Sequence, residues 1–361
     1  MTVYVILLYT IFFMYCLRKY RFIGSSQYNC VCNMRTGAQN KYETNYQNIW
    51  VIVLFCIVLI AFRGSTVGID TAAYGREFYM FDFSSLTDSR YSSERGFMLL
   101  NVLLKEAGFD FWVLTLLEAL VVMLPATYLI RKYSKNPYLS FFYFIAMDYF
   151  CFSLTGMRQA FALGITMIAF EFAQRKKFIP FVLLVLLAMV FHKTAMVFLP
   201  VYFISRISLK KKYIFWIIVG SFAVFLMKEP IRTIMRELAR IDHKAIDTGG
   251  TGMYLFFVAI ALVGIVFSKA KWNEKMEGSV FFYMLFCAIA VYPVLQYNPT
   301  ILRLHYYYSV MLIILIPNIL DQIHSKIIRY GCGSVFFVVG LYYMFAYPLQ
   351  NMGITPYRFM W

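Results

Sequence analysis

The chain has 361 residues, of which 61% are hydrophobic and only 14% are charged. Soluble globular domains carry roughly 25% charged residues, so the composition excludes an ordinary soluble protein. The net charge is +16, but the basic residues recur between hydrophobic runs instead of forming one patch, which argues against nucleic acid as a partner and is typical of cytoplasmic membrane loops.

Repeated apolar runs with short connections favour an all-α, polytopic membrane protein, because a membrane barrel would show alternating strands. The first run, 2–17, has no basic residue before it and no small-residue cleavage site, so a retained span is favoured over a signal peptide. Cys30 and Cys32 form a lone C-x-C that is expected in a loop. Without a second pair, ordinary thiols are favoured over a zinc site.

The runs predict about twelve spans (11–13) in a single transmembrane domain, 1–361, with a GT-C-like helical membrane architecture. In chain order they lie at about 2–17, 47–62, 111–130, 138–153, 157–174, 178–191, 193–205, 213–227, 252–268, 279–297, 302–320 and 333–347. Two of them, 178–191 and 193–205, are short for a bilayer and could instead form one broken or re-entrant pair.

Basic clusters follow every second predicted span. They lie at 18–21, 131–135, 175–177, 210–212, 269–275 and at Lys326 with Arg329. The positive-inside rule therefore places these loops in the cytoplasm and both termini outside. The segment 63–110 and the loop 228–250 then fall on the outer side. Apolar residues in that loop recur at helical spacing, which favours an amphipathic interfacial helix over a flexible loop.

Nine polar residues reach this outer face: Arg63, Asp70, Glu94, Arg95, Arg158, Gln159, His192, Arg303 and His305. Each has a plain explanation. An arginine at a helix end can extend to lipid head groups, and the carboxylates can pair with Arg63 and Arg95. His192 can be a packing residue, and the tyrosines at 306–308 can form an interfacial aromatic belt.

Taken together, arginines from four segments would repel one another unless an anion lay among them, and phosphate or pyrophosphate matches the guanidinium fork. A pyrophosphate site in a membrane suggests a lipid-linked sugar. Carboxylates and a histidine can take a proton from a hydroxyl group.

The sequence has no H-E-x-x-H, cysteine-rich set or D-x-D, so no metal and no cofactor is expected. It has no G-x-S-x-G, which lowers the case for a serine hydrolase.

Five motifs resemble the EpsG family in their order and spacing: "FRGSTVGIDTAAY", "SERGFMLLN", "GMRQAFALGI", "FHKTAMVFLP" and "LRLHYYY". These are Wzy-like polymerases of bacterial exopolysaccharide, capsule and O-antigen, and the resemblance runs from about 49 to 310. It implies a multi-pass inner-membrane protein that joins undecaprenyl-diphosphate-linked repeat units on the outer side. The residues that match are Arg63, Gly64, Gly68, Asp70, Tyr74, Glu94, Gly96, Arg158, Gln159 and His192. Thr194 stands where similar proteins often have serine.

The resulting hypothesis is a metal-independent glycosyltransferase of inverting type, since no covalent nucleophile is evident. Arg158 and Arg303, helped by Arg63 and Arg95, would hold the diphosphate. One of His192, Asp70 and Glu94 would be the base, with His192 ranked first and Asp70 second. Tyr74, Gln159 and His305 complete the predicted substrate-binding set. Expected partners are the lipid-linked oligosaccharide, membrane lipids and a chain-length co-polymerase.

Three alternatives remain. A flippase for the same lipid-linked sugar explains the arginines but gives the carboxylates and histidine no proton to transfer, and no internal repeat of the kind common in transporters is evident. A membrane O-acyltransferase would use a histidine but leaves the arginines unexplained. A ligase of the O-antigen type is not separated from a polymerase by the sequence.

Overall fold

A computed structural model describes residues 1–32, 49–88, 94–206, 211–227, 230, 250–267, 279–295 and 302–361. Within these ranges the chain is helical and has no strand; the one isolated antiparallel bridge joins Arg63 to Phe359. The predicted all-α fold class is therefore confirmed.

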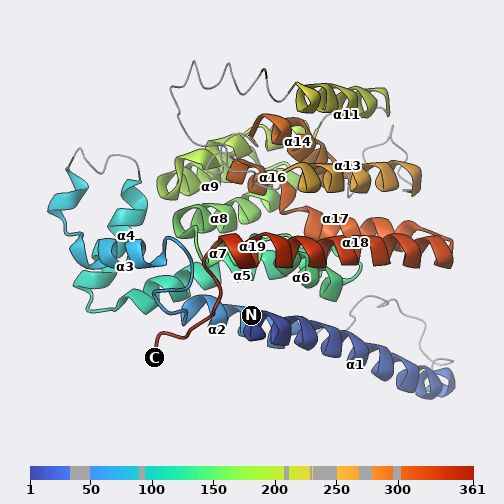
Figure 1. The fold of residues 1–361 in the computed structure, drawn as a ribbon, viewed down its shortest axis with the longest axis horizontal. Helices are drawn as coiled ribbons and strands as arrows, with labels where there is room; N and C mark the ends of the chain where they lie inside the picture. Colours follow the sequence, from blue (N-terminus) through green and yellow to red (C-terminus); the bar gives the residue numbers. More distant parts are fainter. Residues whose placement is uncertain are drawn as a thin grey trace.

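The helices follow most of the predicted apolar runs (Figure 1). They are α1 (Thr2–Cys32), α2 (Ile49–Ala61), α3 (Thr71–Met80), η1 (Ser84–Leu86), α4 (Arg95–Glu106), α5 (Phe111–Tyr133), α6 (Pro137–Ala146), α7 (Tyr149–Ser153), α8 (Met157–Gln174), α9 (Phe178–Phe191), η3 (Lys193–Phe198), α10 (Val201–Ile204), α11 (Lys211–Leu226), α13 (Gly250–Phe267), α14 (Ser279–Leu295), η4 (Arg303–His305), α16 (Tyr306–Ser309), α17 (Leu312–Gln322), α18 (Lys326–Ala346) and α19 (Pro348–Asn351).

Two stretches are long and apolar enough to cross a membrane alone: α5 and residues Lys326–Asn351. The pair Arg303–Ser309 and Leu312–Gln322, bent by 44°, makes a third if it is one span. A further eight apolar helices of 10–17 residues lie in the described ranges. The membrane-protein class follows from these elements, while the count of about twelve spans stays a prediction.

Helix α1 differs from the prediction at its C-terminal end. It continues to Cys32 instead of ending near residue 17, so the prediction that Cys30 and Cys32 lie in a loop is wrong. Residues 18–32 contain no proline, and lysine and arginine are good helix formers. The basic cluster at 18–21 therefore does not end the helix.

The predicted continuous span 138–153 is broken. Helix α6 ends at Ala146, and α7 begins at Tyr149. Between them Asp148 has a φ of 78°, in the left-handed region, which an α-helix of L-residues cannot pass through. The Asp148 side chain is fully buried, and the Tyr306 hydroxyl donates to its Oδ2. The run 193–205 is likewise divided, into η3 and α10.

The long helix α5 joins two ends of the molecule that differ in their side chains. It begins at Phe111, whose ring lies 5.9 Å from that of Phe78 on α3. At its other end Lys132 and Tyr133 both bind Glu171 of α8. We call the end of the molecule at Phe111 the site end, and the end at Lys132 and Tyr133 the basic end.

Three of the predicted cytoplasmic clusters meet at the basic end. Arg175 pairs with the same Glu171 at 2.6 Å, which places 131–135 beside 175–177. Asn318 of α17 donates to the Tyr133 carbonyl at 2.9 Å and accepts from the Lys135 backbone at 2.8 Å. The start of α18, with its basic residues, follows α17 directly.

The segment 63–110 forms α3, η1 and α4 at the site end, where Figure 1 shows them at the left of the molecule. The start of α1 and the C-terminal segment lie together, because the Tyr4 hydroxyl donates to the Ile354 carbonyl at 2.9 Å. The predicted amphipathic helix of 228–250 lies outside the described residues, apart from positions 230 and 250. The basic cluster 269–275 also lies outside them.

Candidate functional site

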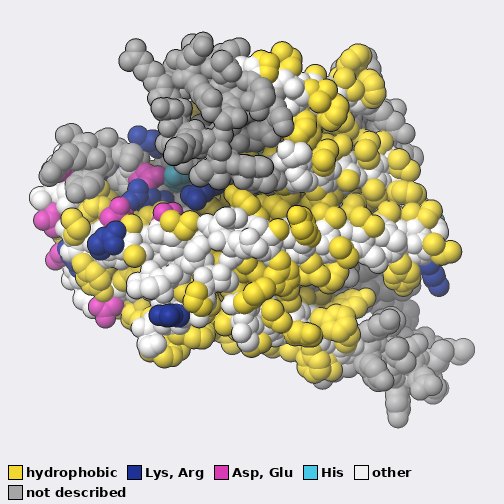
Figure 2. All heavy atoms as spheres, viewed as in Figure 1, with side chains coloured by type: hydrophobic (Ala, Val, Ile, Leu, Met, Phe, Trp, Pro, Cys, Tyr) yellow, Lys and Arg dark blue, Asp and Glu magenta, His cyan; other side chains and the backbone are white. Residues whose placement is uncertain are grey.

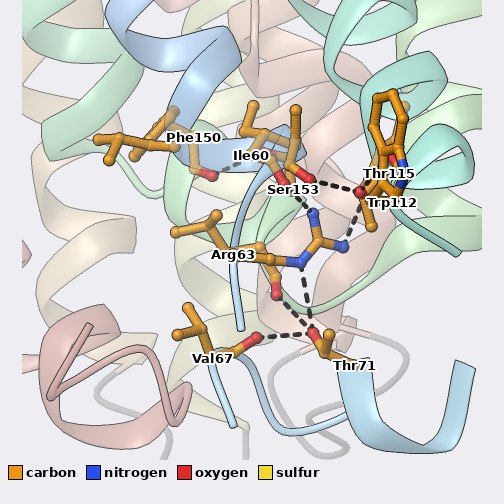
Figure 3. A network of polar contacts seen from close by, with 12 residues as sticks. Ile60, Arg63, Val67, Thr71, Trp112, Thr115, Phe150 and Ser153 are labelled. Carbon is orange, nitrogen blue, oxygen red and sulfur yellow. Dashed lines mark hydrogen bonds and ion pairs between the residues drawn. The ribbon is translucent and has the colours of Figure 1, made fainter. Parts of the chain in front are cut away.

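Arg63 lies inside the protein, where the chain leaves α2 and turns toward α3. Its Nη2 donates to Glu118 Oε2 at 2.8 Å, and neither side chain has any exposed surface. Its Nη1 donates to the Ile60 carbonyl at 2.7 Å, and its Nε to Thr71 Oγ1 at 3.4 Å (Figure 3). Arg63 therefore joins α2, α3 and α5, and does not extend to lipid head groups or pair with Asp70.

The turn after Arg63 depends on a glycine. Gly68 has a φ of +92°, and a Cβ there would lie 1.9 Å from the Leu154 carbonyl oxygen. Its N–H donates to the Gly353 carbonyl at 2.9 Å, and Gly64 N–H donates to the Arg358 carbonyl at 2.8 Å. The turn is thus enclosed between the end of α7 and the C-terminal segment, which fixes where α3 begins.

Arg158, in the first turn of α8, lies between two carboxylates of the segment 63–110. Its Nη1 donates to Glu94 Oε2 at 2.6 Å, and its Nη2 donates to Glu77 Oε2. The guanidinium carbon lies 5.3 Å from the ring centroids of both Tyr74 and Phe97. Glu77 was not among the predicted site residues. Its position three residues after Tyr74, on the same face of a helix, was the signal available in the sequence.

His192 and Glu94 form the centre of the candidate site. Helix α9 ends before His192, whose extended backbone (φ −155°) directs the chain into η3, and its Nδ1 bonds to Glu94 Oε1. Burial alone would raise the pKa of Glu94, but the hydrogen bond from His192 and the charge of Arg158 outweigh it and lower that pKa. An ionised carboxylate only accepts, so Nδ1 is the donor of this bond, and in a neutral ring the lone pair would then be on Nε2.

Gly96 allows this contact. A Cβ on Gly96 would lie 2.0 Å from Val190 Cγ1 and 2.9 Å from the Val190 carbonyl oxygen. The first turn of α4 can therefore approach the last turn of α9, two residues before His192. Glu94, which precedes α4, is thereby brought to the imidazole.

The tyrosines at 306–308 bind two other segments, the break between α6 and α7 and the short helix η3. Tyr306 donates to Asp148, Tyr307 lies 3.1 Å from Thr194 through their hydroxyl oxygens, and Tyr308 donates to the Val197 carbonyl. All three are buried, so the aromatic-belt interpretation is wrong. Residues on a short helix project about 100° apart, which is why Tyr306 reaches Asp148 while Tyr307 and Tyr308 reach η3.

Arg303 lies beside this group and is half-buried. Its carbonyl accepts a hydrogen bond from Gln159 Nε2 at 2.9 Å, and its guanidinium lies 5.5 Å from the centroid of the Phe152 ring. No carboxylate among the described residues forms an ion pair with it. His305 is buried, with Nδ1 3.0 Å from Ser309 Oγ.

The remaining predicted residues lie on α3 and α4. Asp70 is half-buried directly before α3 and makes no capping hydrogen bond there. Tyr74 packs under Arg158, and burial raises the pKa of its hydroxyl. Arg95 is exposed at the start of α4. Glu94 therefore pairs with Arg158 and His192, and the expected pair with Arg95 is not formed.

Figure 2 shows acidic, basic and histidine side chains gathered at the site end, whereas the rest of the visible described surface is largely hydrophobic. Contacts connect the site residues across the chain: Glu94 joins His192 to Arg158, and Gln159 joins α8 to Arg303. The predicted convergence of these four segments on one end is thus seen in the structure.

Apolar helices with an ion-pair network at one end define a helical membrane protein with a polar site. Residues 48–359 match the EpsG family, and the chain belongs to this family. Membership indicates a function of the polysaccharide-polymerase type in a membrane. No curated protein and no solved structure matches the chain.

Proposed function

We propose that the protein is a glycosyltransferase that polymerises lipid-linked repeat units. It would transfer a glycan from undecaprenyl diphosphate to a sugar hydroxyl of another lipid-linked unit, on the outer face of the bacterial inner membrane. The observation that carries this proposal is the connected set Arg158–Glu94–His192 at the end where Arg303 also lies. A base oriented by a carboxylate, beside guanidinium groups, suits transfer from a diphosphate to a hydroxyl.

His192 is the proposed base. With 26% of its side chain exposed it can meet a substrate, while Glu94, at 12%, is mostly covered. Glu94 holds the hydrogen on Nδ1, so Nε2 faces the acceptor hydroxyl as a proton acceptor, and the carboxylate stabilises the imidazolium that forms. Glu94 is then a positioning residue, and Asp70 is the next candidate for the base.

In the proposed step the acceptor hydroxyl loses its proton to His192 Nε2, and its oxygen attacks the anomeric carbon of the donor. The bond from that carbon to the diphosphate oxygen breaks, and the electron pair leaves with the diphosphate. Arg303 and Arg158, with exposed Arg95, would stabilise the departing charge. Single displacement of this kind inverts the anomeric configuration.

The other predicted binding residues have supporting roles in this proposal. Arg63 and His305 are buried, so they would hold the turn at 63–70 and the start of α16 in place. Tyr74 stacks on Arg158, and Gln159 fixes the Arg303 backbone. A chain-length co-polymerase would meet the protein at the site end, where the growing glycan emerges.

Deleting the gene and sizing the surface glycan tests the function. Single repeat units on the cell surface would support polymerisation, and complementation with the wild type should restore long chains while His192→Ala should not. Complete retention of the repeat unit inside the cell would show flipping instead. Long chains that remain on the lipid carrier would show ligation.

A further inference from the structure

We infer that Glu77 is an internal competitor for the donor: it occupies the part of the Arg158 guanidinium that a diphosphate oxygen would bind, and the donor displaces it. This inference rests on the proposed function. Glu77, a residue outside the catalytic set, thereby controls how tightly the diphosphate is held.

The geometry leaves Arg158 engaged on both sides. One terminal nitrogen donates to Glu94 and the other to Glu77. Its third nitrogen, Nε, is buried without a hydrogen-bond partner among the described residues. A phosphate oxygen that seeks the two-pronged contact typical of arginine must therefore replace one of the carboxylates.

The charge leads to the same conclusion. Around Arg158 two carboxylates face one guanidinium, so the cluster is negative as long as His192 is neutral. The two carboxylates already lie against the guanidinium, and their negative charge would repel an incoming diphosphate. Loss of one carboxylate leaves a neutral cluster, which reduces this repulsion, and frees the terminal nitrogen that the carboxylate bound.

Glu77 is the carboxylate that can leave. Glu94 uses both of its oxygens, for Arg158 and for His192, and its side chain is 12% exposed. Glu77 has one ion-pair partner among the described residues, and its side chain is 32% exposed. It is carried by the ten-residue helix α3. Rotation of its side chain into water breaks a single contact and leaves the Glu94–His192 pair intact.

The test is a binding titration of purified full-length protein in detergent with farnesyl diphosphate as the probe. Glu77→Gln removes the competing charge and should tighten binding about fivefold, the effect of losing an ion pair worth roughly 1 kcal/mol. Glu77→Ala should tighten it at least as much. Glu106→Gln is the matched control, because Glu106 is an exposed glutamate on α4 and its change removes the same charge; its binding should stay within about twofold of wild type.

Arg158→Gln separates this inference from the proposed function. If Arg158→Gln weakens binding strongly but Glu77→Gln binds no tighter than wild type, Glu77 does not compete and the inference is wrong. If wild type and Arg158→Gln bind the probe equally, Arg158 does not hold the diphosphate. That result would overturn both the inference and the role of Arg158 in the proposed function. Equal tightening by Glu77→Gln and Glu106→Gln would show a general effect of net charge and would also overturn the inference.

Discussion

A single carboxylate, Glu94, connects the two halves of the proposed chemistry, because its oxygens bind a histidine and an arginine from different segments. The sequence predicted that these three residues share one face, since the basic clusters fix the alternation of the loops. It could not predict the pairing. His192 is separated from Glu94 by 98 positions and Arg158 by 64, and the expected partner, Arg95, is adjacent in sequence but exposed.

The first prediction concerns the role of His192 as the base. His192→Ala should slow turnover by roughly a hundred- to ten-thousand-fold, the usual contribution of a general base, while binding of the lipid-linked donor changes little because arginines hold it. Purified turnover, donor binding and melting temperature are to be compared for His192→Ala and His192→Gln. A stable His192→Gln protein with near-normal turnover would move the base to Asp70.

The second prediction is a pH effect of Glu94 on stability. Because the pKa of Glu94 is lowered in the folded protein, its contribution to stability is complete above the ordinary carboxyl value of about 4.3 and is lost as the pH falls through the lowered value. The part of the melting temperature that Glu94 contributes should therefore be lost only in acid, below about pH 4. Glu94→Gln should lack that part, whereas Glu106→Gln should keep it. An identical acid profile in Glu94→Gln and wild type would contradict the ion-pair network.

The third prediction concerns Arg303, which has no ion-pair partner among the described residues. Arg303→Ala should nearly abolish polymerisation in a folded protein, because it removes a charge-assisted contact to the diphosphate. Arg303→Lys should restore only part of the activity, since lysine lacks the two-pronged donor. Glycan length in complemented cells measures both. Full-length glycan with Arg303→Ala would exclude this arginine from the diphosphate site.

At the scale of elements, hydrophobic runs predicted where most helices lie but not where they break. Asp148 is the single charged residue of the run 138–153, and a lone aspartate does not stop a helix by propensity alone. Its break depends on the contact with Tyr306 from α16, which is a tertiary effect. The site depends on such breaks: His192 lies between α9 and η3, and Arg303 opens η4.

The fourth prediction tests how two elements are brought together at the site. Gly96→Ala places a Cβ against Val190, which should push α4 away from α9 and separate Glu94 from His192. Overpacking of this kind costs about 1–3 kcal/mol, so we expect a folded protein with strongly reduced turnover. Gly220→Ala on α11 is the control, because nothing lies within 4 Å of a Cβ there. Equal activity of the two variants would show that the close approach of α4 is not needed.

For the whole molecule, the distribution of charge gives the two ends different environments. Contacts of Glu171 and Asn318 gather three of the predicted cytoplasmic clusters at the basic end, and the candidate residues gather at the other. The sequence predicted this division because lysine and arginine mark cytoplasmic loops. It did not predict how the segment 63–110 folds over Arg158, since short polar helices such as α3 carry little periodic signal.

The last prediction is the orientation of the two ends in the membrane. In a variant without native cysteines, Thr87→Cys lies beside η1 at the site end, and Lys177→Cys lies at the start of α9 at the basic end; both positions are exposed. An impermeant thiol reagent added to spheroplasts should label position 87 and not position 177, because the positive-inside rule places the basic loops in the cytoplasm. After permeabilisation both should be labelled, which shows that each thiol can react. Labelling of 177 but not 87 before permeabilisation would reverse the orientation and move the site to the cytoplasmic face, where the repeat unit would meet it before export and not after.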